Sequence, residues 1–181
     1  MKKQVIHIYG GSGSGTTTLG KRLSERLGYT FMDTDDYFWQ PTDPPFIRKR
    51  PIEERLALMR RDIDAAEHAV ISGSLVDWGD ALIPYFTLAV RVETEQTIRL
   101  DRLRRRERER FGARIAPGGD MYEEHEKFIA WAAEYDTGDI NMRSRAKHDE
   151  WEKLLTCGLI VVDGTADLEE NCARVEEMLC D

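Results

Sequence analysis

The chain has 181 residues, a length that suits one domain with room for small inserted lobes. Hydrophobic residues make up 41%, enough for a core, and the net charge of −8 argues against non-specific binding to nucleic acid. The three cysteines lack C-x-x-C spacing, the chain enters a predicted strand without a signal peptide, and no apolar run reaches membrane length. We therefore expect reduced thiols, no membrane partner and a cytoplasmic location.

The first predicted elements are a strand, a glycine-rich loop and a helix, in that order. Residues 5–9 alternate as a β-branched strand, and residues 10–18 read GGSGSGTTT. The helix over 16–27 places three leucines on one face. Glycines let the backbone turn its N–H groups toward an anion, and the helix N-terminus adds unpaired donors. The stretch therefore predicts a phosphate site, whereas a flexible linker would lack the flanking strand and helix.

The loop fits the P-loop spacing G-x-x-x-x-G-x-T with one departure. The residue before Thr17 is ordinarily lysine, and here it is Thr16. The Thr17 hydroxyl can still bind Mg²⁺, and we expect Lys21 to point elsewhere from its helical position. If the site holds a triphosphate, the missing positive charge must come from another segment.

The rest of the chain alternates between predicted helices and strands. We expect further strands at residues 29–32, 69–74, 88–92 and 159–162, and helices at about 52–67, 77–86, 95–110, 120–134, 141–155 and 167–179. The aromatic and proline stretch 37–46 is expected to be an irregular loop on the substrate side, and 111–119 an irregular excursion. Five strands alternating with helices predict a parallel sheet covered on both faces, with ligands at the carboxyl ends of the strands.

Three carboxylates follow the second predicted strand, at Asp33, Asp35 and Asp36. In a parallel sheet this position faces the phosphate loop, where phosphoryl transfer needs metal-bound phosphates and an oriented acceptor. A carboxylate here can hold a metal-bound water or accept the acceptor's proton, so Asp33 and Asp35 are candidates for these roles, with Thr17 and Asp33 at the metal. The alternative is that these residues cap a turn or helix.

Arginines are concentrated in residues 99–114, which hold eight arginines and three acidic residues. A guanidinium group binds phosphate oxygens well, so this segment could supply the charge missing at Thr16, as could Arg143 and Arg145. The alternative for each arginine is a solvated helix face with local ion pairs.

Other candidates lie after the second and third strands. The aromatic side chains Tyr37, Phe38, Trp39 and Trp78 could stack on a base or pack in the core. The turn Ser72-Gly73-Ser74 permits close approach of a substrate, and Lys49 and Arg50 could bind an anionic acceptor. We expect His7 to be a packed core histidine, and the remaining histidines have no metal spacing.

Together these residues resemble the P-loop nucleoside and nucleotide kinase superfamily, especially adenylate kinase-like proteins, with a variant loop carrying threonine in place of lysine. The resemblance implies a three-layer αβα fold with a five-stranded parallel sheet in the order 2-3-1-4-5. It implies one domain over residues 1–181 with a LID-like helical insertion at about 105–142. Residues 35–41 are also similar to the acceptor motif of uridine and nicotinamide riboside kinases, and residues 33–35 to the acidic motif of shikimate kinases.

The resemblance also assigns candidate site residues. Arginines entering and leaving the LID would be Arg102, Arg105, Arg143 and Arg145, and Asp163-Gly164 would lie near the adenine. The resulting nucleotide-binding set is Gly10, Gly11, Ser12, Gly13, Ser14, Gly15, Thr16, Thr17, Thr18, Arg143, Asp163 and Gly164. The resulting catalytic set is Asp33, Asp35, Arg102, Arg105 and Arg145. The substrate-binding set is Asp36, Trp39, Arg50, Ser72, Gly73 and Ser74.

The leading functional hypothesis is a kinase that uses ATP and Mg²⁺ to phosphorylate a small acceptor. A nucleoside monophosphate is favoured over a hydroxyl acceptor such as a nucleoside or a shikimate-like alcohol. A monophosphate would need Arg50 or a neighbouring cation, whereas a neutral alcohol would depend more on Asp35 or Asp36. The missing loop lysine motivates a second hypothesis, a nucleotide-binding regulatory protein without transfer activity. RNA binding through the arginine-rich helix is disfavoured by its acidic residues, and the oligomeric state is left open.

Overall fold

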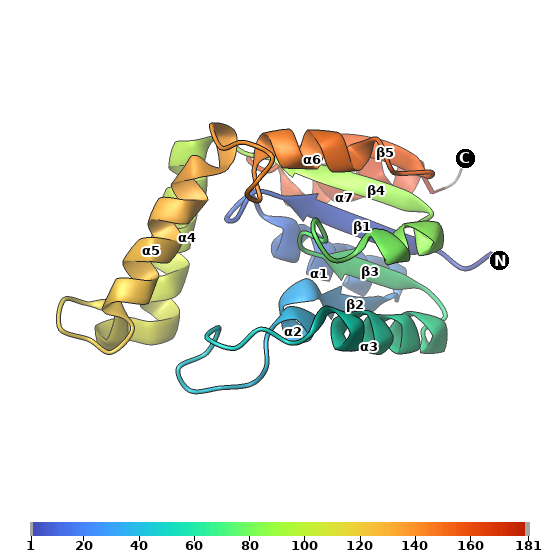
Figure 1. Ribbon diagram of the computed structural model, residues 1–181. Coiled ribbons are helices and arrows are strands. Elements are labelled where there is room, and N and C mark those ends of the chain that lie inside the picture. Colours follow the sequence, from blue (N-terminus) through green and yellow to red (C-terminus); the bar gives the residue numbers. More distant parts are fainter. Residues whose placement is uncertain (1, 180–181) are drawn as a thin grey trace.

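The computed structural model describes residues 2–179 and contains a five-stranded, all-parallel sheet (Figure 1). The strands are β1 (Val5–Gly10), β2 (Thr30–Asp33), β3 (Ala69–Ser72), β4 (Leu88–Glu93) and β5 (Gly158–Asp163). Their order is β2-β3-β1-β4-β5, with β1 in the centre paired to β3 and β4. The predicted fold class and strand order are therefore confirmed.

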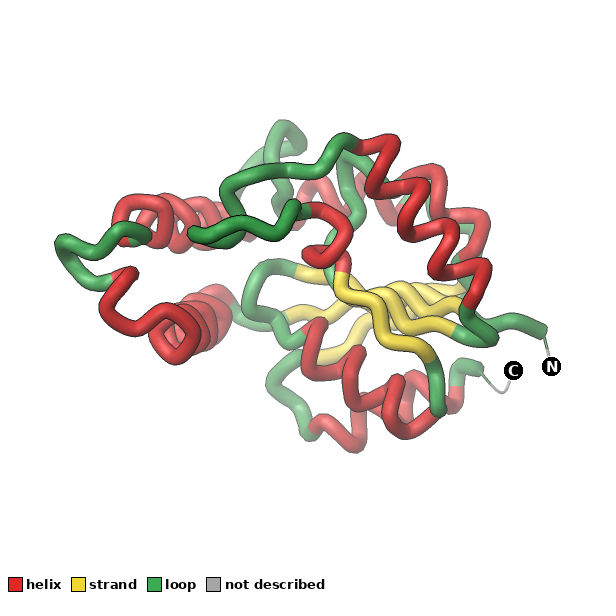
Figure 2. Tube along the Cα trace, turned by 90° about the horizontal axis from the view of Figure 1, so that it is seen from below, coloured by secondary structure: helices red, strands yellow, loops and turns green. Residues whose placement is uncertain are grey.

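Helices cover both faces of this sheet (Figure 2). They are α1 (Thr16–Leu27), α2 (Thr34–Phe38), α3 (Ile52–Ala65), α4 (Gln96–Phe111), α5 (Tyr122–Ala133), α6 (Arg145–Glu152) and α7 (Leu168–Glu177). Short 3₁₀ helices η1 (Asp80–Tyr85), η2 (Gly112–Ile115) and η3 (Glu134–Asp136) lie between them. No helix among the described residues has both the length and the apolar character that crossing a membrane would require.

The alternation of side chains along β1 divides the core into two layers. Ile6 and Ile8 pack with Leu19 and Leu23 of α1 and with α7, on one face of the sheet. Val5 and Tyr9 point to the other face and pack with α3, η1 and α6. His7 lies on that second face, fully buried and stacked against Tyr9 and Phe86, which confirms its prediction as a core histidine.

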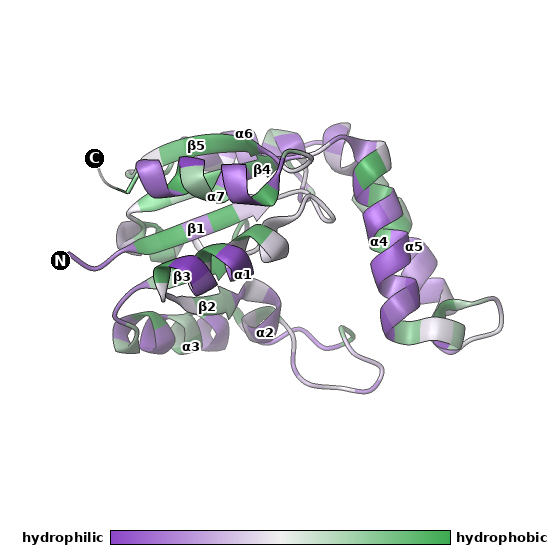
Figure 3. Ribbon diagram, turned by 180° about the vertical axis from the view of Figure 1, so that it is seen from behind, coloured by the Kyte–Doolittle hydropathy of each residue, from purple (hydrophilic) through white to green (hydrophobic). Residues whose placement is uncertain are grey.

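Helices α4 and α5 form an antiparallel hairpin that projects away from the sheet (Figures 1 and 3). Figure 3 shows α4 as largely hydrophilic, whereas the strands are largely hydrophobic. The hairpin has its own small core, in which Leu103, Ile129 and Ala132 are buried against Leu100, Phe128 and Trp131. Because this core is separate from the sheet, the hairpin resembles an appended lobe more than part of the central layers.

Three predicted boundaries are wrong, and side-chain caps account for two of them. Tyr37 and Phe38 are helical, because the Asp33 carboxylate accepts the N–H of Asp35 and begins α2. Helix α6 begins at Arg145 rather than at residue 141, since the Ser144 hydroxyl caps it by accepting from the N–H of Lys147. The segment after β3 is an open turn followed by 3₁₀ helix η1 rather than one short α-helix from residue 77.

Candidate functional site

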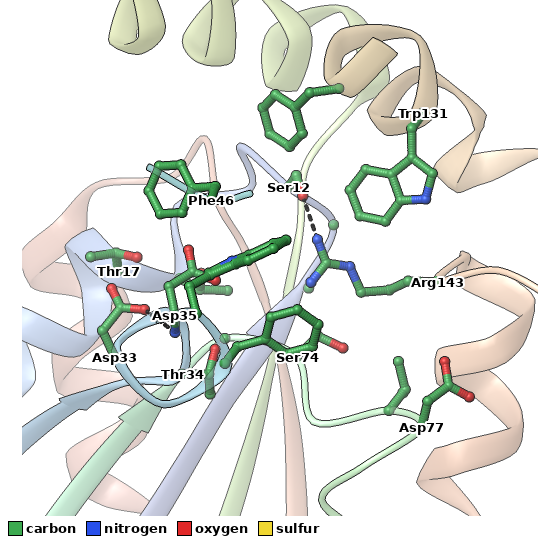
Figure 4. Close-up of a pocket in the computed structure, with 18 of the residues that line it drawn as sticks. Ser12, Thr17, Asp33, Thr34, Asp35, Phe46, Ser74, Asp77, Trp131 and Arg143 are labelled. Atoms are coloured by element: carbon green, nitrogen blue, oxygen red, sulfur yellow. Dashed lines mark hydrogen bonds between the residues drawn. The ribbon is translucent and has the colours of Figure 1, made fainter. Parts of the chain in front are cut away.

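A large cavity opens at the carboxyl ends of β1, β2 and β3 (Figure 4). Its volume is about 780 Å³, and its walls come from the glycine loop, α2, the loop after α2, the β3–η1 turn and the α4–α5 hairpin. These segments are far apart in the sequence and meet only because parallel strands bring their ends together. The cavity therefore lies at the carboxyl ends of the strands, where ligands were predicted to bind.

The glycine loop forms one wall and is shaped to hold an anion. Gly13 and Gly15 have φ angles of +82° and +109°, and a Cβ at Gly13 would collide with the carbonyl oxygen of Arg99. Helix α1 starts directly after Gly15 without a side-chain cap, so its first N–H groups remain available. Of the predicted loop residues, Gly10, Gly11, Ser12, Gly13, Thr16 and Thr17 line the cavity. Ser14 is buried behind the loop and Thr18 is exposed outside the cavity.

Thr17, Asp33 and Asp35 present hard oxygen atoms on the same side of the cavity (Figure 4). Among residues 2–179 there is no cluster of three acidic, cysteine or histidine side chains that would cage a metal. This donor set fits Mg²⁺, which is commonly bound by one or two protein oxygens, phosphates and waters. Residues of this kind beside a glycine loop therefore fit a site for Mg²⁺ and a nucleoside triphosphate.

The three predicted carboxylates have different surroundings. Asp33 is partly buried at the start of α2, where desolvation raises its pKa despite the hydrogen bond from the N–H of Asp35 at 3.0 Å. Asp35 is exposed to the cavity, opposite the basic residue Arg143 (Figure 4). Asp36 is exposed and lies outside the lining of the cavity.

Two arginines of α4 hold the glycine loop from behind. Arg99 is 1% exposed, donates to the carbonyls of Ser12 and Thr94, and pairs with Asp136 at 2.6 Å. Arg102 donates to the carbonyls of Ser14 and Gly164, which joins the loop to the segment after β5. Neither side chain lines the cavity. Both arginines therefore stabilise the backbone of the glycine loop from outside the cavity.

Of the three other predicted arginines, one lines the cavity and two lie outside it. Arg105 is exposed on α4, outside the cavity. Arg145 is also outside it, with its guanidinium paired to Glu93 at 2.8 Å and to Asp136 at 2.9 Å. Arg143 does line the cavity and donates to the hydroxyl of Ser12 in the glycine loop at 2.9 Å. The structure thus brings Arg143, and not Arg105 or Arg145, to the cavity side of the glycine loop.

The far end of the cavity is aromatic and contains a buried cation. Phe38, Trp39 and Trp78 line it, together with Phe46 of the loop. Phe128 and Trp131 of the hairpin also line the cavity, and Trp131 lies beside Arg143 near the glycine loop (Figure 4). Arg55 of α3 is 6% exposed and its guanidinium stacks over the Phe38 ring at 3.8 Å. It donates to the carbonyl of Arg50 at 2.6 Å, and burial lowers its pKa. A buried cation of this kind can bind an anionic group of a ligand.

Sequence reasoning selected Arg50 for this role and missed Arg55. Arg50 lies outside the cavity lining, and its guanidinium donates to the carbonyls of Tyr37 and Trp39 and pairs with Glu54. The signal for Arg55 was its spacing, because it shares a helix face with the buried Met59 and Ile63. An arginine on the apolar face of a helix is a candidate for a buried charge.

The turn after β3 contributes a hydroxyl group to the cavity. Gly73 has a φ of +117°, and a Cβ there would collide with the Thr34 side chain, so a larger residue would displace α2. Ser74 lines the cavity, and its hydroxyl shares a hydrogen bond of 2.9 Å with Nε2 of His148. Nδ1 of His148 is 2.8 Å from the Tyr135 hydroxyl. Ser72 is fully buried and does not line the cavity.

The predicted adenine-side residues lie behind the glycine loop. The N–H of Gly164 donates to the Glu93 carbonyl, and a Cβ at Gly164 would collide with the carbonyl of Ser14. Asp163 is exposed and accepts hydrogen bonds from the backbone and hydroxyl of Thr165. Both residues lie outside the lining of the large cavity, next to the loop that it contains.

Two buried histidines predict an acid-sensitive fold. Burial lowers the pKa of His148 to about 3 and that of His7 to about 4, from an ordinary value of 6.5. The unfolded chain binds these protons near pH 6.5, so stability is complete above that pH and falls as the pH decreases toward 4. Each histidine should cost about 1.4 kcal/mol per pH unit in this window.

Urea titrations at pH 7, 6 and 5 measure this loss of unfolding free energy. The unfolding free energy of His148→Gln should depend less on pH than that of the unsubstituted protein, because the variant takes up one proton fewer on unfolding. Equal pH dependence of the two proteins would show that His148 is not kept neutral by the fold.

Comparison with known proteins agrees with this geometry. The family model AAA_18, described as an AAA domain, matches residues 6–127. The uncharacterized protein YqaC of Bacillus subtilis (strain 168) is 42% identical over 179 residues, covering 99% of this chain and 98% of that protein. Shikimate kinase 2 of Photorhabdus laumondii is 45% identical over 40 residues, which is 22% of this chain and 23% of that enzyme.

Solved structures share the fold at low sequence identity. Shikimate kinase from Bacteroides thetaiotaomicron superimposes with a TM-score of 0.58 and 19% identity, covering 97% of this chain and 98% of that chain. Shikimate kinase from Acinetobacter baumannii in complex with shikimate has a TM-score of 0.54 and 13% identity, covering 99% of this chain and 94% of that chain. The chain therefore belongs to the AAA_18 family, within the P-loop nucleotide kinase superfamily.

Proposed function

We propose that this protein is an ATP-dependent small-molecule kinase whose acceptor is a nucleoside monophosphate. One cavity contains a phosphate-binding loop at one end and a buried cation among aromatic rings at the other. Such an arrangement suits transfer between two bound molecules, because catalysis of phosphoryl transfer is mainly positioning and charge stabilisation.

The loop end fits the nucleotide donor. MgATP, when bound, supplies the phosphoryl group. The amides of the loop and of the α1 N-terminus would hold its phosphates, and the hydroxyl of Thr17 would hold Mg²⁺ with Asp33 nearby. The α4–α5 hairpin would act as a lid, since Arg106, Glu107 and Trp131 of the hairpin already line the same cavity.

The acceptor end carries the observation on which the choice of acceptor rests. Within residues 2–179, Arg55 has no carboxylate at ion-pair distance, although its side chain is buried. A phosphate would supply the missing anion, and the rings of Trp39, Phe46 and Trp78 would pack against a base. Asp35 would orient the acceptor from the side of the donor.

A hydroxyl acceptor is the second candidate, supported by the carboxylates of Asp33 and Asp35 in the cavity. The two candidates make different demands on the site. A monophosphate depends on Arg55, whereas an uncharged alcohol depends on the carboxylates that orient its hydroxyl.

The direct test is release of ADP from ATP in the presence of Mg²⁺ and a panel of acceptors. The panel should contain the common nucleoside monophosphates, the matching nucleosides, shikimate and simple polyols. We expect at least one monophosphate to accelerate ADP release well above the rate with water, and its nucleoside to do so less. Acceleration by no acceptor would contradict the kinase proposal, and preference for an uncharged alcohol would replace the proposed acceptor.

A further inference from the structure

The glycine loop lacks a cation where its spacing calls for one. Thr16 lines the cavity at the position of the expected lysine, and its side chain carries no charge. We propose that Arg143 supplies this positive charge to the phosphates of bound ATP, from a segment more than a hundred residues away. The inference rests on the ATP site of the proposed function, and it assigns the residue that completes it.

The first argument is position. Three arginines donate to the loop, but Arg99 and Arg102 bind its carbonyls from outside the cavity. Arg143 donates from Nη2 to the side-chain hydroxyl of Ser12, on the side of the loop that lines the cavity (Figure 4). Of the arginines that donate to the loop, it is therefore the one placed where phosphates would bind.

The second argument is charge. Arg99 is neutralised by Asp136, whereas no carboxylate among the described residues pairs with Arg143. Burial lowers the pKa of Arg143, and the negative charge of Asp35 acts in the opposite direction. A half-buried guanidinium that lines the cavity without a carboxylate partner gains most from a polyanion.

The other basic residues that line the cavity contact other groups or are exposed. Arg106 pairs with Glu107, and Arg55 stacks on Phe38 at the acceptor end. Lys49 lies over the same Phe38 ring, at 5.8 Å from its centre. Arg110 is exposed on the hairpin. None of these side chains donates to the glycine loop.

The hairpin holds Arg143 in place through an aromatic contact. The guanidinium lies 4.5 Å from the ring centre of Trp131, on α5 (Figure 4). The cation is thus fixed on one side by Ser12 of the loop and on the other by the lid. A lysine in the loop would keep its charge beside the phosphates wherever the lid lies. Arg143 differs, because contact with Trp131 of the lid helps to hold its charge there.

A charge exchange between the two positions tests the proposal. Arg143→Met removes the charge, and Thr16→Lys restores one at the ordinary loop position. We expect Arg143→Met to lower kcat by about 10²-fold and to weaken MgATP binding by about tenfold more than AMP binding. The double variant should recover to within about tenfold of the unsubstituted protein in both measurements. Arg60→Met, which removes an exposed charge from α3, should change neither.

Binding of MgATP, ADP and AMP to each variant is measured by fluorescence titration, independently of turnover. Arg143→Gln serves if the methionine variant does not fold, because an amide can keep the hydrogen bond to Ser12. Equal weakening of ATP and AMP, or no recovery on adding Thr16→Lys, would overturn the proposal. Selective loss of ATP binding without turnover by any protein would instead support Arg143 and contradict the kinase function.

Discussion

Replacing Thr17 with valine should remove the Mg²⁺ dependence of ATP binding and lower kcat/KM by about 10²- to 10³-fold. Thr17 is the second residue of α1 and lines the cavity on the same side as Asp33 and Asp35. Valine has nearly the same shape, so the helix and its exposed amides should persist while the metal ligand is lost. Proteins usually bind Mg²⁺ through only one or two side chains, so removing one of them removes a large part of the protein's contribution to the metal site.

The measurement compares ATP affinity with Mg²⁺ and with a chelator in both proteins. The unsubstituted protein should bind ATP more tightly with the metal, and Thr17→Val should bind it about equally in both conditions. Thr17→Ser keeps the hydroxyl and should retain most of the metal effect. If Thr17→Val retains the full Mg²⁺ effect, the metal is held by other groups and Thr17 has no role as its ligand.

The elements that the sequence predicted well are those whose signals are local. The β-branched run of β1, the glycines of the loop and the leucine spacing of α1 lie within residues 5–27, and the helix bounds 16–27 are confirmed. Gly28 ends α1 in the left-handed conformation, as its position after the last leucine predicts. The parallel order of the strands follows from the alternation of elements together with the family resemblance.

The pairing of charged residues could not be predicted in the same way. Arg105, Arg143 and Arg145 all occur in plausible segments, but their roles depend on which carboxylates lie beside them after folding. Arg145 meets Glu93 and Asp136, which come from β4 and η3, whereas Arg143 two residues earlier meets Ser12. A difference of two positions at the start of α6 thus separates a paired arginine from one that faces the cavity.

The hydrogen bonds that join Ser74, His148 and Tyr135 beside the cavity were missed for a related reason. His148 showed no metal spacing, and nothing near it in the sequence indicated that Ser74 and Tyr135 would bond its two ring nitrogens. Those partners come from the turn after β3 and from η3. Contacts of this kind are set by packing across the sheet, which neither periodicity nor motif spacing encodes.

Replacing Arg55 with methionine should separate the two candidate acceptors. The side chain is buried among aromatic rings, and methionine can occupy much of the same volume without the charge. Loss of a desolvated charge-assisted contact to a phosphate should cost about 2–4 kcal/mol, which raises KM for a monophosphate by about 30- to 10³-fold. The affinity for ATP should change little, because Arg55 lies at the other end of the cavity from the glycine loop.

The acceptor panel and a control variant decide the interpretation. With Arg55→Met, turnover of a nucleoside should be nearly unchanged while turnover of its monophosphate falls, so the preference between them shrinks. Arg60→Met on the same helix removes an equal charge from an exposed position and should leave KM unaltered. If turnover of charged and uncharged acceptors falls equally, Arg55 instead supports the cavity wall through its stacking on Phe38. The acceptor's anion would then have to be bound elsewhere, with Lys49 as the next cation in the cavity to replace.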